Sequence, residues 1–230
     1  MQGRDGLGAD VDNDGAETGM LRPQSLVELA TDRLRSEILS GALVPGERLV
    51  EEQLTQRFQI SRAPLREALR LLMEQGLVEH LPRRGARVKT YSDRDFDELF
   101  AVRNALERFA LTQTGGHGLE GRDLTGVESA LETLRGAAQR SDRLAASNAH
   151  RAFHLALVAL AGNRQLLVTY EPIIVKLQLY MAANLRREAD TSSPIEGVRR
   201  HERLLDALLQ GDPVRIGDEL DRHGARRYFH

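Results

Sequence analysis

The 230-residue chain contains no cysteine and no long apolar run. Without cysteine there can be neither a disulfide framework nor a thiolate ligand, so any metal site must use histidine and carboxylate side chains. No stretch approaches the roughly 18 consecutive apolar residues that span a membrane, and the first residues lack the basic and apolar regions of a signal peptide. We therefore expect a cytoplasmic protein with no membrane partner.

Lysine is also nearly absent, since only Lys89 and Lys176 occur and almost every cation is an arginine. The guanidinium group is a planar fork that suits phosphates and base edges. Residues 1–20 have one arginine against five acids, whereas residues 21–91 have twelve arginines and lysines against nine acids. The excess of positive charge is therefore local to residues 21–91.

The composition, 41% hydrophobic and 29% charged, is typical of a globular chain with one large or two modest domains. Residues 1–20 are acidic and glycine-rich without an apolar period, which predicts a disordered tail. Within residues 21–91, apolar spacing and turn residues predict helices over 25–40, 50–58 and 62–75, followed by a β-hairpin around the basic loop PRRGAR. Three helices and a hairpin in this order are typical of a winged helix-turn-helix DNA-binding domain.

The third predicted helix has several start signals. Ser61 stands at the N-cap position, Ile60 and Leu65 are spaced as a hydrophobic staple, and Pro64 lies in the first turn, where a missing N–H costs little. The apolar side of this helix is expected to pack on the first two helices.

Arg62 and Arg66 lie on the opposite side of the third helix, four residues apart, where they suit the bases and phosphates of a major groove. The alternative is an ordinary solvated helix face, explained by helix propensity alone. The hairpin favours DNA binding, because a basic wing has its own docking role against the duplex. Its candidate contacts are Arg83, Arg84 and Gly85.

Beyond Tyr91 the pattern is helical almost without interruption and begins with a possible capping box from Ser92 to Asp95. Helices are predicted near 93–113, 122–140, 142–161, 164–187, 195–210 and 213–228. The predicted fold class is mainly α, with a winged helix-turn-helix domain over residues 21–91 and an all-helical bundle over residues 92–230.

Four of the seven histidines fall on inward faces of these helices. His150 and His154 lie on the same side of one helix, as i and i+4 metal-binding pairs do, whereas His201 and His223 come from two other helices. The alternative for each is a core histidine with satisfied hydrogen bonds. An all-histidine site favours Zn²⁺, with Ni²⁺ as the second choice, over a hard ion.

A metal-dependent hydrolase is the main rival from another functional class. Between His150 and His154 lie Arg, Ala and Phe, so the glutamate base of H-E-x-x-H is absent, and we do not expect an enzyme. Arg103 lies on an apolar helix face in LFAVRNALE, where Glu107, four residues on, is the simplest partner for it.

The run PGERLVEEQLTQRFQISRAPLREALRLLMEQGLVEHLPRRGARV resembles the DNA-binding domain of the GntR family of bacterial transcription regulators. The family pattern of PGxxLxExxLA, then SRTPVREAL, then GLV and a glycine-containing wing is present nearly in order over residues 26–90. The helical remainder, with FHLAL, GN and two later histidines, resembles the FadR-type (FCD) effector-binding domain. The resemblance implies operator contacts from Ser61, Arg62, Ala63, Pro64, Arg66 and Gly85.

In the resembled family, the helical domain often holds a divalent metal between its helices. The matching positions are His150, His154, His201 and His223. His150 departs from the pattern, because an aspartate is more usual there. The resemblance also implies that Arg103 reaches the effector pocket and that Asn163 lies near it, so that a small carboxylate would bind both an arginine and the metal.

Together these patterns predict a homodimeric, ligand-responsive transcription regulator, most simply a repressor, that binds double-stranded operator DNA and a small organic acid. A variant of this hypothesis makes the metal itself the signal.

Overall fold

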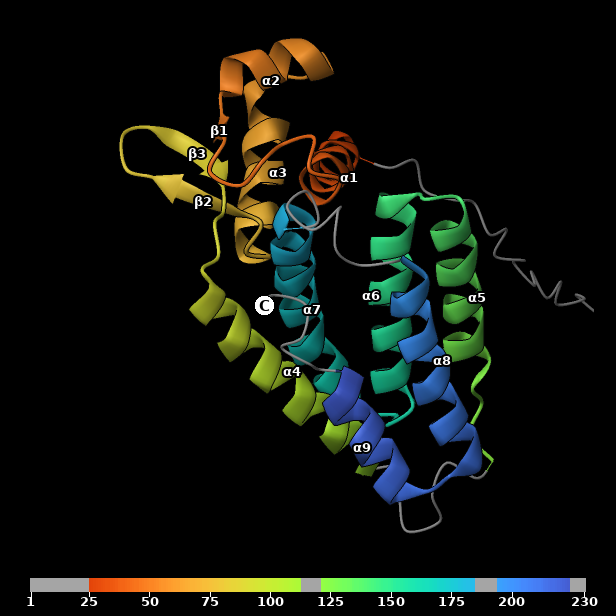
Figure 1. Ribbon diagram of the computed structural model, residues 1–230. Helices are drawn as coiled ribbons and strands as arrows, with labels where there is room; N and C mark the ends of the chain where they lie inside the picture. The colour runs from red at the N-terminus through yellow and green to blue at the C-terminus, as the bar shows by residue number, and fades with distance from the viewer. Residues whose placement is uncertain (1–24, 113–120, 185–193, 224–230) are drawn as a thin grey trace, which may run out of the picture.

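The computed structural model describes residues 25–112, 121–184 and 194–223 (Figure 1). The predicted tail over residues 1–20 and the predicted helix ends beyond Thr112, Asn184 and His223 lie outside the described residues. Among the described helices, none is both long enough and apolar enough to cross a bilayer.

The N-terminal part of the chain contains a small sheet packed with three helices. Its elements are α1 (Leu26–Leu39), β1 (Arg48–Leu49), α2 (Glu51–Phe58), α3 (Arg62–Glu74), β2 (Val78–Leu81) and β3 (Gly85–Val88). Strand β3 pairs antiparallel with both β2 and β1, so the strand order is β1-β3-β2. The hairpin was predicted, but β1 was not, because a two-residue strand has no measurable period.

Helix α3 packs against α1 and α2 and buries its apolar side, as its spacing predicts. Leu65 and Leu72 are fully buried, whereas Arg62 and Arg66 on the opposite side are exposed. Ser61 occupies the N-cap position with an extended backbone, but its side chain makes no capping hydrogen bond, contrary to the sequence prediction. The Ser61 hydroxyl is therefore not used by the helix itself.

The rest of the described chain is helical. Its elements are α4 (Asp93–Thr112), α5 (Thr125–Gln139), α6 (Arg143–Ala159), α7 (Arg164–Asn184), α8 (Pro194–Gln210) and α9 (Pro213–His223). The capping box that opens α4 is present, with Asp95 accepting from the Ser92 backbone at 2.9 Å and the Ser92 hydroxyl accepting from the Asp95 backbone at 3.2 Å. The fold is therefore mainly α, as predicted.

Helix α7 belongs to the cores of both parts of the molecule. Near its start, Tyr170 lies in a buried cluster with residues of α4 and α6. Further along, Val175 and Leu179 join the buried cluster of the winged helix-turn-helix part. Figure 1 shows the end of α7 next to α1 and α3. A single helix thus connects the interior of the bundle with the winged helix-turn-helix part.

Candidate functional site

The first candidate site is a basic groove on the winged helix-turn-helix part. It has a volume of about 300 Å³ and lies between β1, the start of α2, the start of α3 and the tip of the hairpin. Arg62 from α3 and Arg84 and Gly85 from the hairpin line it. Arg48 adds a third arginine, and Glu51 and Glu52 at the start of α2 also line the groove, so arginines outnumber glutamates by three to two. The structure therefore brings Arg62, Arg84 and Gly85 to one surface. Of the other predicted residues, Ser61, Ala63 and Arg83 are exposed and Pro64 is half-buried.

The conformation of the wing depends on two residues in the left-handed backbone region. Arg83 has φ 61° and Gly85 has φ 86°, and the Arg84 backbone N–H donates to the Leu81 carbonyl at 2.9 Å to close the turn. Sequence reasoning missed Arg48, which lies on β1 and whose Nη2 donates to the Arg84 carbonyl oxygen at 2.8 Å. Its role depends on the pairing of β1 with β3, which no local pattern shows.

The arginines of α3 differ in their surroundings. Arg66 Nε lies 2.9 Å from Glu51 Oε2 in an exposed ion pair, and such pairs are worth only about 0–1 kcal/mol. Arg70, one turn further, is held by both Glu67 and Glu74. A DNA phosphate or base could therefore displace the single carboxylate from Arg66 more easily than the two carboxylates from Arg70.

The second candidate site is the histidine cluster in the bundle. His150 and His154 come from α6, His201 from α8 and His223 from α9, and one nitrogen of each lies within 4.8 Å of the others. His154, His201 and His223 are buried, whereas His150 is partly exposed. Tertiary packing of three helices thus brings together the four histidines that the sequence singled out.

Hydrogen bonds identify the free nitrogen on one of these rings. His201 Nδ1 lies 2.7 Å from the Gly197 carbonyl oxygen, which can only accept, so Nδ1 carries the proton and Nε2 carries the lone pair. That Nε2 and the His223 Nδ1 are buried and have no hydrogen-bond partner among the described residues. A buried polar atom without a partner is costly and often marks the place of an ion or a ligand.

The spacing of the rings also suits a metal ion. The Nε2 atoms of His154 and His223 lie 3.1 Å apart, close to the roughly 3.3 Å between two nitrogens on a tetrahedral Zn²⁺ with bonds of about 2.0–2.1 Å. Four imidazoles without a carboxylate form a donor set that suits Zn²⁺, Ni²⁺ or Cu²⁺. The residues present therefore fit a divalent transition metal.

Burial is the largest cause that lowers the pKa of all four histidines, and the positive charge of Arg103 adds to it. For His150 and His201, the charge of Arg200 acts in the same direction. Neutral imidazoles are the form that binds metals, so the cluster holds its rings in that form near neutral pH.

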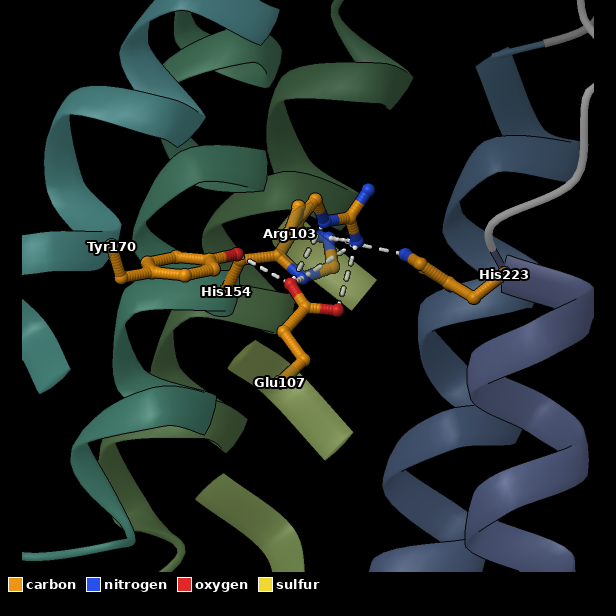
Figure 2. A network of polar contacts seen from close by, with 5 residues as sticks. All are labelled: Arg103, Glu107, His154, Tyr170 and His223. Carbon is orange, nitrogen blue, oxygen red and sulfur yellow. Dashed lines mark hydrogen bonds and ion pairs between the residues drawn. The ribbon is translucent and has the colours of Figure 1, made fainter. Parts of the chain in front are cut away.

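A polar network adjoins the cluster, and Figure 2 shows Glu107 at its centre. Arg103 Nε donates to Glu107 Oε1 at 2.8 Å, His154 Nδ1 lies 2.9 Å from the same oxygen, and the Tyr170 hydroxyl also donates to it. Burial tends to raise the pKa of the Glu107 carboxyl, but the charge of Arg103 and the contact with His154 outweigh it and hold that pKa far below its usual range. Glu107 is therefore a buried carboxylate.

The two residues expected to bind an effector are placed differently. Arg103 pairs with Glu107, as the simpler alternative predicts, but its Nη2 also lies 3.1 Å from both nitrogens of His154. Asn163 is exposed, and its side chain accepts from the Leu166 backbone N–H at 3.1 Å, at the start of α7. Within the described residues, this contact does not join Asn163 to the histidine cluster.

Sequence reasoning missed Tyr170 and treated Glu107 only as a partner for Arg103. Tyr170 lies among apolar residues at helical spacing, which is typical of a core position. A signal was nevertheless available, because a buried tyrosine hydroxyl needs a polar partner and a buried glutamate needs several.

The basic groove and the helical bundle together define a DNA-binding transcription regulator of the winged helix-turn-helix class. The family model described as bacterial regulatory proteins, gntR family, matches residues 26–88, and the FCD domain model matches residues 98–226. The chain belongs to the GntR family and has an FCD domain, so it is a transcription regulator and not an enzyme.

Individual relatives agree with this assignment. The chain is 32% identical over 208 residues to the HTH-type transcriptional regulator BphR of Paraburkholderia xenovorans (strain LB400), covering 87% of this chain and 82% of the relative. It is 29% identical over 196 residues to the HTH-type transcriptional repressor GlaR of Escherichia coli (strain K12), covering 83% and 88%. The solved structure of E. coli McbR/YncC has a TM-score of 0.69 at 26% identity, covering 88% of this chain and 94% of that one.

Proposed function

We propose that this chain is a cytoplasmic, homodimeric repressor of the FadR branch, whose helical domain (92–230) binds a small organic acid at a divalent metal site. The ligands in this proposal are His150, His154, His201 and His223, and Zn²⁺ is the preferred ion, with Ni²⁺ as the second choice. The observation that supports the site is the convergence of one nitrogen from each of four imidazoles within 4.8 Å. In addition, His201 Nε2 is buried and has no hydrogen-bond partner among the described residues.

The winged domain (21–91) would bind operator DNA through the basic groove. In this proposal Arg62 and Arg66 read the major groove, the backbone around Ser61, Ala63 and Pro64 lies against phosphates, and the hairpin approaches the minor groove. The contacts from the hairpin are Arg83, Arg84 and Gly85. Support comes from the shared surface that Arg62, Arg84 and Gly85 line.

The Arg103 contact with His154 suggests how the metal site and an organic acid would be linked. Arg103 Nη2 lies 3.1 Å from both nitrogens of the His154 ring, so the guanidinium lies against a proposed metal ligand without being aligned with the lone pair of either nitrogen. If the histidines held an ion, the Arg103 guanidinium beside them would be available to donate to the carboxylate of an organic acid bound there.

Homodimer formation is proposed because a twofold dimer presents two recognition helices to half-sites about one helical turn apart. Val102 and Phe109, seven residues apart on α4, are 48% and 44% exposed and offer apolar surface to a second copy. Sedimentation of the wild type and a Phe109→Glu variant tests this contact: we expect a dimer and a monomer, respectively. A wild-type monomer at micromolar concentration would contradict the proposal.

Metal content per chain is the first experiment. We expect near-stoichiometric Zn²⁺ or Ni²⁺ by mass spectrometry of untagged protein, and none in a His154→Ala, His201→Ala double variant. A His80→Ala variant is the matched control, because His80 is exposed on β2 and lies outside the cluster. Equal metal content in all three proteins, or no metal in any of them, would mean that the four histidines are core residues and not metal ligands.

Operator binding with a panel of small carboxylates then tests the effector. We expect an acid that chelates the metal to weaken operator binding through a coupling of about 1–3 kcal/mol, and Arg103→Met to abolish the response. Operator affinity that stays constant across the panel would count against the effector. If mild chelation alone removed the metal and changed operator binding, the metal itself would be the signal.

A further inference from the structure

Glu107 is a fully buried carboxylate where three helices meet. It lies on α4 with 0% of its surface exposed, and it contacts Arg103 of the same helix, His154 of α6 and Tyr170 of α7. Figure 2 shows Tyr170 and His223 approaching this group from opposite sides. A buried carboxylate needs several donors, and the donor from α6 is His154, one of the four histidines of the cluster.

The contact with His154 determines which nitrogen of that ring is available. An ionised carboxylate only accepts hydrogen bonds, so His154 Nδ1, 2.9 Å from Glu107 Oε1, must be the protonated nitrogen. The lone pair is then on Nε2, which faces the His223 Nε2 at 3.1 Å. The Gly197 carbonyl acts in the same way on His201, where it leaves Nε2 free. Two rings in the cluster are thus anchored through Nδ1 and present Nε2.

The other partners of Glu107 hold the carboxylate itself in place. Arg103 binds both oxygens, with Nε 2.8 Å from Oε1 and Nη2 3.3 Å from Oε2. The Tyr170 hydroxyl donates to Oε1 from the far side. The carboxylate therefore has one orientation and a balanced charge, as a group that positions a metal ligand requires.

We propose that Glu107 is the positioning residue of the metal centre, fixing the tautomer and the orientation of His154 so that Nε2 is the ligand atom. This inference rests on the proposed metal site. It assigns to Arg103 and Tyr170 a second role, which is to hold the Glu107 carboxylate against the imidazole.

Zinc affinity of the full chain, measured by competition with a chelator of known affinity, tests this role. The variants are Glu107→Gln and the double variant Arg103→Met, Glu107→Gln, which leaves no unbalanced buried charge if the single variant fails to fold. We expect both to bind Zn²⁺ about 10- to 100-fold more weakly than the wild type. Glu219→Gln is the matched control, because Glu219 is also buried and ion-paired but contacts Arg203 and Arg222.

Nitrogen-15 NMR of the histidine rings provides a readout that a purely structural role would not change. In zinc-loaded wild type we expect His154 to keep a slowly exchanging proton on Nδ1, and in the Glu107 variants we expect that proton to exchange faster. Unchanged zinc affinity in a folded Glu107 variant, or a proton on Nε2 of the wild-type ring, would overturn the inference. If the wild type itself bound no Zn²⁺, the proposed metal site would fail, and this inference with it.

Discussion

Lowering the pH of the metal-free protein from about 7.5 to about 5.5 is expected to lower its free energy of unfolding by about 2.8 kcal/mol. His154, His201 and His223 are buried, and burial is the main cause that lowers their pKa values in the folded protein. In the unfolded chain each imidazole titrates near 6.5. Below that pH the unfolded state binds more protons than the folded state, so the folded state loses stability as the pH falls.

The magnitude follows from the number of buried rings. An imidazole that stays neutral in the folded state costs about 1.4 kcal/mol of stability at pH 5.5 and almost nothing at pH 7.5. Burial holds the pKa values of His201 and His223 well below the ordinary value, whereas the Glu107 carboxylate counteracts the shift at His154. The two rings of His201 and His223 together give about 2.8 kcal/mol, a substantial share of the roughly 5–15 kcal/mol that stabilises a typical domain. Glu107 does not contribute in this range, because its pKa is lowered and the carboxylate stays ionised in both states.

Urea unfolding followed by far-ultraviolet circular dichroism, with a chelator present, measures this change. A His201→Asn, His223→Asn variant lacks both of these rings, so its loss between the two pH values should be smaller than that of the wild type by about 2.8 kcal/mol. Other titrating groups act equally on both proteins, so the difference between them isolates the cluster. A free energy of unfolding that is flat with pH, or an equal loss in both proteins, would refute the reasoning.

Three substitutions test other parts of the structure. Arg66→Ala should weaken operator binding by about 1–3 kcal/mol and change sequence preference, whereas an equal loss on all sequences would make Arg66 a phosphate contact. Arg48→Gln removes the hydrogen bond to the Arg84 carbonyl and should therefore lower operator affinity several-fold. The free energy of unfolding should change by no more than about 1 kcal/mol. Unchanged operator affinity in gel shifts would contradict this prediction. Gly76→Ala should destabilise the protein more than Gly211→Ala does in thermal unfolding. Both glycines have a positive φ, so both substitutions strain the backbone. Only at Gly76 would the added Cβ also meet a neighbour, because it would lie 2.7 Å from Lys176 Cε, whereas the space around Gly211 is open. Equal effects of the two glycine substitutions would mean that the approach of Lys176 costs nothing.

Much of the secondary structure could be predicted, because most of these elements have a strong local period. The apolar positions of α3 recur at helical spacing, so Leu65 and Leu72 could be assigned to the core and Arg62 to the surface. Strand β1 could not be predicted, since its pairing with β3 spans almost forty residues. Arg48 was missed for the same reason.

The local sequence pattern could predict only one half of the candidate metal site, the pair of histidines on one helix. His150 and His154 share a helix face because they are four residues apart, and this spacing holds in any α-helix. Their meeting with His201 and His223 depends on how α8 and α9 pack against α6, which the sequence alone did not determine.

The sequence by itself determined the type of each element, the location of the basic surface and the residue types available to a ligand, because periodicity, capping and charge are local properties. Only the tertiary structure decided that Glu107 faces His154 as well as Arg103, and that Tyr170 completes the group from α7. The physical reason is that a buried carboxylate must satisfy its charge and its lone pairs with whatever donors the packing of three helices supplies.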